Sequence, residues 1–289
     1  MSLSFRVSKS TELLAFLFAS QPAVKRIKVR QALKFGSVVV NGVVTTQFNT
    51  PLKPGDVITI RSDKVAIEAN LLPKGMKIFF EDEHLIIVNK PENLLTIASE
   101  AEQEETLYAY LTNYVRRGKA KSKERIWIVH RLDRETSGLM VFAKTPQAKH
   151  LLQSNWDASE KIYLAVVEGT ITKEKGTLHS HLNETNPYRV FSAKKSKETR
   201  EAITHFKVLK RGQGRTLVEL TLQTGRRHQI RVQLVDYGFP IIGDEKYRAK
   251  TNPARRLGLH SHILRFPHPI TDEKLNYESP LPKELMRLV

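Results

Sequence analysis

The sequence predicts an α+β protein in which a small basic domain precedes a large domain built on a mostly antiparallel sheet. Residues 78–289 contain many short apolar runs separated by polar turns, with fewer helical patterns, as such a sheet requires. Residues 1–66 show another pattern, two helices followed by a hairpin. Residues 67–77 contain Pro73 and Gly75, which interrupt regular structure. We therefore expect domains at 1–66 and 78–289, joined by a linker at 67–77.

The elements of the first domain follow from apolar spacing and turn residues. Residues 11–20 carry apolar side chains at helical spacing. A second helix is predicted to stop at Gly36, and a short strand follows it. Asn41-Gly42 is the strongest short hairpin signal, and the turn at residues 52–56 leads into a further strand.

The large domain is predicted to contain at least seven strand segments and three helices. The strand segments are rich in Val, Ile, Phe and Tyr, which favour strands. They lie at 78–91, 125–132, 138–145, 161–169, 202–210, 216–223 and 257–266, and the helical patterns lie at 105–117, 146–159 and 224–238.

The charge of the chain indicates a polyanionic partner. It has 47 Lys and Arg against 30 Asp and Glu, a formal net charge of +17, which speeds encounter with polyanions. No apolar run reaches the roughly 20 residues of a spanning helix, and the first residues lack the pattern of a signal peptide. We therefore expect a cytoplasmic protein that binds nucleic acid and no membrane.

The absence of cysteine limits the possible chemistry. Without cysteine the chain has no disulfide, no Cys-ligated zinc, no iron–sulfur cluster and no thiolate nucleophile. Any metal would rely on His and carboxylate ligands, and any nucleophile on Ser, Thr, Lys or a carboxylate.

Basic residues gather in three predicted loops of the large domain. Several such loops together suggest a surface that follows a phosphate backbone. The first loop contains Arg116, Arg117, Lys119, Lys121, Lys123 and Arg125, the second Lys194, Lys195, Lys197 and Arg200, and the third Arg248, Lys250, Arg255 and Arg256.

The segment from His130 to Leu139 concentrates polar residues where a predicted strand ends. An apolar strand runs into His130, Arg131, Leu132 and Asp133, and the chain turns at Gly138 into another apolar strand. Charged residues at the end of a strand are well placed to act on a ligand. They are equally able to hold a loop, and on this feature alone the structural interpretation is favoured.

A long resemblance changes that interpretation. The segment HRLDRETSGLMVFAKT resembles the defining motif of the RluA-type pseudouridine synthases, and four further blocks of that family follow the same order. The blocks are IFFEDEHLIIVNKPENLL at 78–95, KIYLAVVEG at 161–169, LQTGRRHQIRVQL at 222–234, and Gly243, Asp244 and Tyr247 followed by LGLHSHILRF at 257–266. The resemblance implies the fold of that family, isomerisation of uridine in RNA, and no cofactor or metal.

The resemblance also implies roles for individual residues. Asp133 would be the nucleophile, attacking either the uracil ring or the ribose C1′. It must be ionised, so it needs a cation that lowers its pKa and fixes its rotamer. Arg231 is the candidate and Arg226 the reserve, because Ile230 and Leu234 place the predicted helix of Arg231 against the core.

Three further residues are expected to contact or to border the target nucleotide. Tyr163 would stack on the target base and assist proton transfer from C5, although a strand tyrosine alone indicates only packing. Arg131 would help to displace the nucleotide and fill its gap, since a stacked base must be extruded before reaction. His130 would orient the loop or serve as a structural histidine. Supporting roles near the site are predicted for Asn89, Lys90, Pro91, Asp244 and His260.

The first domain resembles the alpha-L RNA-binding motif. Residues GSVVVNG and LKPGDVI with the preceding helix carry this resemblance. Ten Lys and Arg against three acidic residues in 1–66 favour RNA binding over an ordinary solvated helix face. The residues expected to contact the RNA backbone are Lys25, Arg26, Lys28, Arg30 and Lys34.

The predicted substrate is a structured RNA, first the large-subunit ribosomal RNA and alternatively transfer RNA, bound by an enzyme expected to be a monomer. A non-catalytic RNA-binding ribosome-assembly protein remains an alternative. A metal-dependent nuclease is a second one, although the sequence lacks a dense carboxylate cluster. The chain departs from the family at Glu92-Asn93, where Ala-Gly is frequent, and at Gln233, where His is usual; both departures bear on substrate choice.

Overall fold

The computed structural model describes residues 3–22, 24, 26–34, 37–60, 72–98, 105–116 and 122–289. The chain forms two compact units, Met1–Lys74 with Ala109–Arg125, here called the N-terminal unit, and Gly75–Tyr108 with Ile126–Val289, here called the large unit. Among the described residues, no helix combines the length and apolar character needed to cross a membrane.

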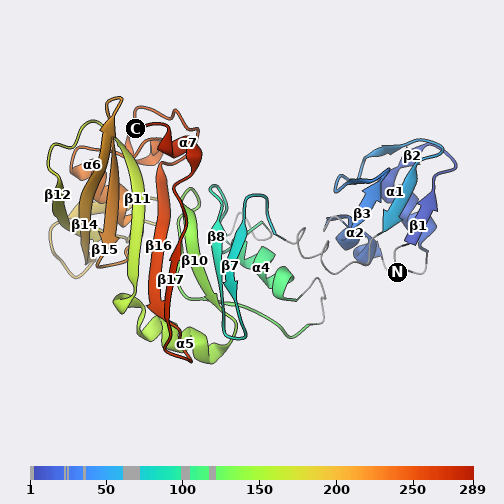
Figure 1. The fold of residues 1–289 in the computed structure, drawn as a ribbon, viewed down its shortest axis with the longest axis horizontal. Coiled ribbons are helices and arrows are strands. Elements are labelled where there is room, and N and C mark those ends of the chain that lie inside the picture. The colour runs from blue at the N-terminus through green and yellow to red at the C-terminus, as the bar shows by residue number, and fades with distance from the viewer. Residues whose placement is uncertain are drawn as a thin grey trace. The chain divides into compact units, whose positions relative to one another are not determined.

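The N-terminal unit contains the two helices and the hairpin that the sequence predicts (Figure 1). Its buried core includes Leu13, Leu17 and Ile58. Asn41 and Gly42, with φ of 49° and 86°, turn the chain between β3 and β4, while the predicted helix stop at Gly36 lies outside the described residues. The elements within its residues 3–60 are β1 (Leu3–Arg6), β2 (Thr11–Glu12), α1 (Leu13–Ser20), α2 (Arg26–Lys34), β3 (Val38–Val40), β4 (Val43–Val44), β5 (Pro51–Leu52) and β6 (Val57–Ile60). The four-stranded sheet has the order β1-β6-β3-β4, and β2 pairs with β5.

The large unit is built on an 11-stranded sheet, which confirms the predicted α+β class. Its strand order is β13-β12-β14-β15-β11-β16-β10-β8-β7, with β17 beside β16 and β9 beside β10. The pairing is antiparallel throughout except between β10 and β16. The strands are β7 (Lys77–Glu81), β8 (Leu85–Lys90), β9 (Trp127–Ile128), β10 (Ser137–Ala143), β11 (Glu160–Glu168), β12 (Lys175–Asn183), β13 (Phe191–Ala193), β14 (Thr199–Gly212), β15 (Arg215–Leu222), β16 (Leu259–Pro267) and β17 (Lys274–Glu278).

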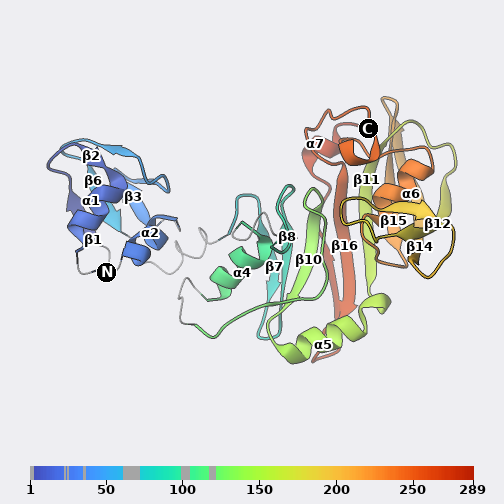
Figure 2. The ribbon, with the colours of Figure 1, turned by 180° about the vertical axis from the view of Figure 1, so that it is seen from behind.

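Each predicted helical segment after the hairpin contains an observed helix. These helices are α4 (Leu107–Val115), α5 (Pro146–Ser154) and α6 (Gln229–Asp236), and the segment of α5 also contains the 3₁₀ helix η1 (Trp156–Ala158). The structure adds α7 (Lys283–Met286) and the 3₁₀ helix η2 (Glu245–Tyr247). In Figure 2, α6 lies over the end of the sheet formed by β12, β14 and β15. Val232 of α6 packs there against Leu182 and Ala202, so burial of one helix face fixes α6 on the sheet.

The parallel contact between β10 and β16 fixes where the loop before β10 emerges. Gly138 pairs with Ser261 at this contact. A Cβ on Gly138 would lie 2.2 Å from the carbonyl oxygen of Ser261, and its φ is +116°, so only glycine fits. All seven residues of β10 are buried, which makes the strand a rigid support for the residues that precede it.

Candidate active site

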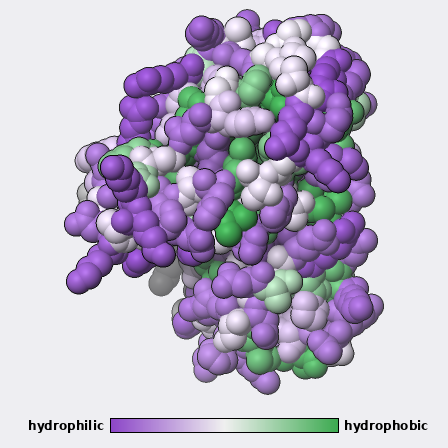
Figure 3. Space-filling model, turned by 90° about the vertical axis from the view of Figure 1, so that its left-hand side faces the viewer, coloured by the Kyte–Doolittle hydropathy of each residue, from purple (hydrophilic) through white to green (hydrophobic). Residues whose placement is uncertain are grey.

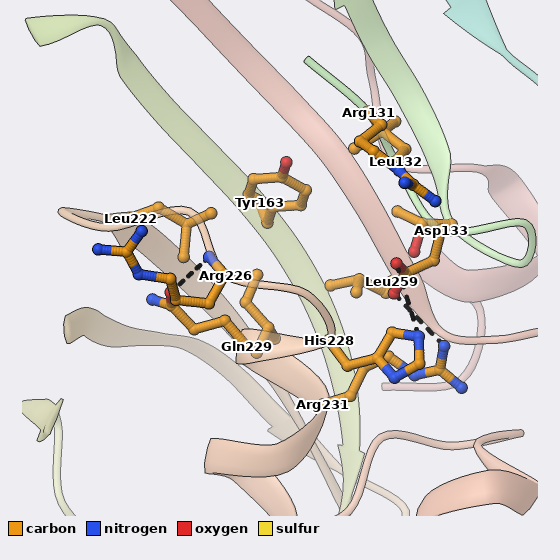
Figure 4. Close-up of a pocket in the computed structure, with 12 residues that line it drawn as sticks. Arg131, Leu132, Asp133, Tyr163, Leu222, Arg226, His228, Gln229, Arg231 and Leu259 are labelled. Atoms are coloured by element: carbon orange, nitrogen blue, oxygen red, sulfur yellow. Dashed lines mark hydrogen bonds and ion pairs between the residues drawn. The ribbon is translucent and has the colours of Figure 1, made fainter. Parts of the chain in front are cut away.

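A small pocket opens where the loop before β10, the centre of β11 and the start of α6 meet (Figure 4). It encloses about 70 Å³. Of the predicted site residues in the large unit, the pocket brings together Asp133, Tyr163, Arg231, Arg131 and Arg226. Its other lining residues are Leu132, Thr136, Leu222, His228, Gln229, Ile230 and Leu259.

Arg231 occupies the buried floor of this site, with 3% of its side chain exposed. Its Nε and Nη2 each donate a 2.8 Å hydrogen bond to one carboxylate oxygen of Asp244. Its Nη1 lies 3.4 Å from Oδ2 of Asp133 and 3.3 Å from Oε2 of Glu135. Burial acts to lower the pKa of Arg231, but the bonds and charge of Asp244 outweigh it and raise the pKa. Arg231 is therefore a permanent cation beside Asp133.

The pKa of Asp133 is raised above its usual value. From the sequence we expected a lowered pKa, because of the neighbouring cation Arg231. Burial is the largest cause of the rise, and only 23% of the side chain is exposed. Arg231 does lower this pKa through its charge and hydrogen bond, as does Arg131, while the charge of Glu135 raises it further. The carboxylate thus gives up hydration to reach the pocket, and one long ion pair compensates only in part.

Tyr163 rises from β11 into the same pocket (Figure 4) and is 9% exposed. Burial raises the pKa of its hydroxyl to about 12, although a hydrogen bond with Ser261 opposes this shift. The ring is therefore a neutral phenol near pH 7. Its apolar body is available for stacking and its hydroxyl for hydrogen bonding.

His228 was not singled out by the sequence, yet it lies in the pocket. Its Nδ1 is 2.8 Å from the hydroxyl of Tyr247, and its Nε2 is 3.8 Å from Oδ1 of Asp133. Burial and the charge of Arg231 lower its pKa to about 3, so the imidazole is neutral. Its backbone is left-handed, with φ of 52°. A single histidine beside two arginines gives no pattern of its own, and only its place in the QTGRRHQIR block could have suggested it.

The loop that carries Asp133 is held by buried side chains that the sequence predicted as supports. The ammonium of Lys90 donates to the carbonyls of Pro91, Leu94 and Arg134 at 2.8–2.9 Å. Lys90 is fully buried, and this burial lowers its pKa to about 7. His260 lies 2.8 Å from the hydroxyl of Ser137 at the end of the loop.

His130 and Arg226 are placed differently from Arg131. His130 lies outside the pocket lining; its Nε2 accepts from the amide of Val141 and its ring stacks on Trp156 at 4.4 Å. We therefore interpret His130 as structural rather than as a substrate contact. Arg226 lines the pocket, but its guanidinium points away from Asp133 (Figure 4) and donates to the carbonyl of Glu201. Arg231, and not the reserve Arg226, contacts the carboxylate.

Part of the predicted RNA contact set can be placed in the N-terminal unit. The guanidinium groups of Arg26 and Arg30 lie 5.3 and 5.9 Å from the centre of the Phe18 ring. Lys25 lies outside the described residues, as do the side chains of Lys28 and Lys34. The two placed arginines stand one helical turn apart on α2, where one aromatic ring orients both.

The residues that depart from the family pattern have structural partners here. Gln233 is buried, accepts from the hydroxyl of Thr204 and donates to the carbonyls of Leu178 and Ala202, so it joins α6 to β12 and β14. Glu92 accepts a 3.0 Å bond from Arg256. Asn93 adopts φ of 60°, a conformation that asparagine tolerates better than most residues.

Within the part of the chain that the structure describes, no group of three or more His, Asp or Glu side chains is arranged to hold a metal ion.

The chain is similar to known proteins along most of its length. The family model described as RNA pseudouridylate synthase matches residues 84–235. An uncharacterized RNA pseudouridine synthase of Bacillus subtilis (strain 168), YlyB, is 34% identical over 97% of this chain and 94% of its own. The chain belongs to the RNA pseudouridylate synthase family. The RluA-type resemblance and the expected enzyme class are thereby confirmed.

A further curated relative and a solved structure are similar to this chain over most of its length. The ribosomal large subunit pseudouridine synthase D of Vibrio cholerae is 31% identical over 91% of this chain and 85% of its own. The solved structure of human RNA pseudouridylate synthase domain containing 4 covers 73% of this chain and 92% of its own, with a TM-score of 0.61 and 24% identity. That structural likeness supports the fold. The alpha-L resemblance of residues 1–66 stays a prediction.

Proposed function

We propose that this pseudouridine synthase isomerises specific uridines in large-subunit ribosomal RNA, with Asp133 as the nucleophile. The observation that carries the proposal is the ion pair of Asp133 with the buried Arg231 in a pocket that Tyr163 also lines. The choice of RNA is supported by the likeness to a ribosomal large subunit enzyme over most of both chains.

The reaction breaks the bond between N1 of the uracil and C1′ of the ribose and forms a bond between C5 and C1′. C5 loses its proton and N1 gains one, so no cofactor is consumed. The carboxylate of Asp133 either bonds to C1′ and is displaced by C5, or adds to the ring and is later eliminated. Both routes require the ionised form of Asp133, and both leave it unchanged after turnover.

Arg231 keeps that ionised form accessible despite burial. Its charge and hydrogen bond act against the desolvation that raises the pKa of Asp133. Asp244 fixes the guanidinium by two short bonds, so the cation does not need to be ordered during the reaction.

Tyr163 and Arg131 are proposed to hold the extruded nucleotide. The neutral ring of Tyr163 offers a flat face for the detached uracil, and its hydroxyl can relay the proton from C5. Arg131 is exposed beside Asp133 and is placed to occupy the gap that the flipped base leaves, which offsets part of the few kcal/mol of unstacking.

The decisive test compares wild type with Asp133→Asn on unmodified ribosomal RNA. We expect loss of pseudouridine and retained RNA binding, with Asp272→Asn as a control for an exposed carboxylate changed in the same way. Normal conversion by Asp133→Asn would contradict the nucleophile. A wild type that binds RNA and converts nothing would instead support the non-catalytic assembly protein.

The target RNA is tested separately, by mapping pseudouridine in cellular RNA with and without the gene. Loss of pseudouridine from the large ribosomal RNA would support the proposal. Loss from transfer RNA alone would show that transfer RNA is the substrate instead. We expect the protein to act in the cytoplasm, which cell fractionation checks. We also expect a monomer, which its mass in solution checks.

The N-terminal unit is proposed to bind the RNA backbone through α2. A double variant, Arg26→Gln with Arg30→Gln, should weaken RNA affinity. The slope of log affinity against log salt concentration should also become less steep, by an amount that corresponds to the loss of up to about two phosphate contacts. The single-turnover rate of the variant at saturating RNA should equal that of wild type. Unchanged affinity and salt dependence would exclude this surface as the contact.

A further inference from the structure

We propose that Tyr188 is a stacking platform for an unpaired nucleobase that flanks the target uridine. Tyr188 is 80% exposed, a larger fraction than any other large hydrophobic residue in the described part of the chain. It lies in the loop between β12 and β13, apart from the catalytic pocket. The inference rests on the proposed function, because it takes the ligand to be RNA.

The loop that presents Tyr188 is held in place by Arg227. The backbone amide of Arg227 donates 2.6 Å to Oε1 of Glu184. Its guanidinium donates to the carbonyls of Glu184, Asn186 and Pro187. Within the loop, the side-chain oxygen of Asn186 accepts the backbone amide of Tyr188 at 2.8 Å. The exposed ring therefore stands on a fixed backbone, so stacking on it costs little ordering of the loop.

The same contacts tie this loop to the wall of the catalytic pocket. Arg227 lies in the chain between Arg226 and His228, and both of these line the pocket. On the other side of Tyr188, the guanidinium of Arg189 lies 5.8 Å from the centre of the Tyr247 ring. Tyr247 in turn contacts His228. The loop of Tyr188 is thus joined to the pocket wall through Arg227 and through the contact of Arg189 with Tyr247, which links the position of the ring to that of the pocket.

The surroundings of Tyr188 suit a polyanion. Its neighbour Arg189 is exposed, and the next turn of chain carries the second of the three basic loops. The face of the molecule in Figure 3 is mainly hydrophilic, with its apolar side chains in small separate patches. An exposed aromatic ring beside an exposed arginine and a basic loop fits RNA better than an apolar protein partner. The exposed residues of the basic loop are Lys194, Lys195, Lys197 and Arg200.

The reaction creates a need for such a platform. Extrusion of the uridine removes a stacking partner from each neighbouring base. An aromatic side chain at a fixed position restores one of these stacks, and stacking is worth about 1–3 kcal/mol per base in single-stranded complexes, or roughly 5- to 150-fold in binding. This stack would contribute to the choice of target, because it requires the flanking base to be unpaired.

The experiment uses the full chain and a short transcript that contains a mapped target site. We expect Tyr188→Ala to lower kcat/KM about 5- to 150-fold, whereas Tyr188→Phe stays near wild type because it keeps the ring. Met286→Ala, which also truncates an exposed apolar side chain of the large unit, serves as the matched control and should change nothing.

A set of transcripts with one flanking nucleotide made abasic then locates the stacked base. At one position the abasic change should impair wild type and Tyr188→Phe but have no further effect on Tyr188→Ala, as expected when both changes remove the same contact. Full activity of Tyr188→Ala, equal loss in Tyr188→Phe, or additive effects at every position would overturn the inference. Wild-type activity of Tyr188→Ala on naked RNA with reduced modification in cells would overturn it in favour of a protein partner. If the wild type itself converts no uridine, the proposed function is wrong, and this outcome is distinct from an effect of Tyr188.

Discussion

Asp244→Asn should destabilise the large unit while making the nucleophile easier to ionise. Asp244 is 1% exposed and binds the guanidinium of Arg231 through both oxygens at 2.8 Å. Removing one partner of a buried ion pair costs about 3–5 kcal/mol. The asparagine keeps one acceptor, and Arg231 keeps Asp133 and Glu135 at 3.4 and 3.3 Å, so we expect the lower end, about 3 kcal/mol.

For a unit of this size that loss corresponds to a fall in Tm of about 6–12 °C, measured by calorimetry. The charge of Arg231 would then be less neutralised, so the pKa of Asp133 should fall and the acid limb of the pH–rate profile should move to lower pH. Asp272→Asn, the same change on an exposed carboxylate, is the control. A Tm shift no larger than that of the control, or an acid limb that moves to higher pH, would refute this account of Arg231.

Three further predictions concern the pH–rate profile, the stability and the metal dependence of the enzyme. Glu135→Gln removes a charge that raises the pKa of Asp133, so the acid limb of activity should shift to lower pH; an unchanged limb would contradict the coupling. Asp133→Asn should raise stability at neutral pH, because a carboxyl whose pKa is raised by folding costs stability above its unfolded pKa, and this gain should vanish below about pH 3.9. EDTA should leave turnover intact while the RNA stays folded, and lost activity restored by a divalent ion would contradict the metal-free mechanism.

Local pattern was sufficient for the elements that bury a continuous apolar face. β8, β10 and β11 could be predicted because nearly all of their residues are buried in the sheet, and a strand buried in this way appears in the sequence as a run of apolar residues. β12 could not, since it lies near the edge of the sheet and buries only Leu178 and Leu182 among polar residues. Short elements such as β13 and α7 are stabilised by tertiary contacts, and their sequences carry little signal of their own.

The site divides in the same way. Asp133 and Tyr163 were predicted from sequence motifs, because their segments resemble family blocks whose residues have known roles. The pairing of Arg231 with Asp133 was predicted from the same motifs. That Arg231 also binds Glu135 and Asp244 could not be read from the chain, because Glu135 lies 96 positions from Arg231 and nothing in the sequence gives the distances between these side chains. Tertiary folding also decides that burial outweighs the arginine in setting the pKa of Asp133.

The unequal bonds of Arg231 have a consequence for the proposed reaction. Asp244 takes two short, nearly fully buried bonds, whereas Asp133 shares the remaining Nη1 with Glu135 at longer distances. A nucleophile locked in a bidentate pair would have to break two charge-assisted bonds before it could attack. Here Asp244 performs the anchoring, and Asp133 experiences the field of the cation while its carboxylate stays free to move toward the nucleotide. The raised pKa of Asp133 belongs to the same arrangement, because a weakly solvated and loosely paired carboxylate is a better nucleophile than one fully neutralised by its arginine.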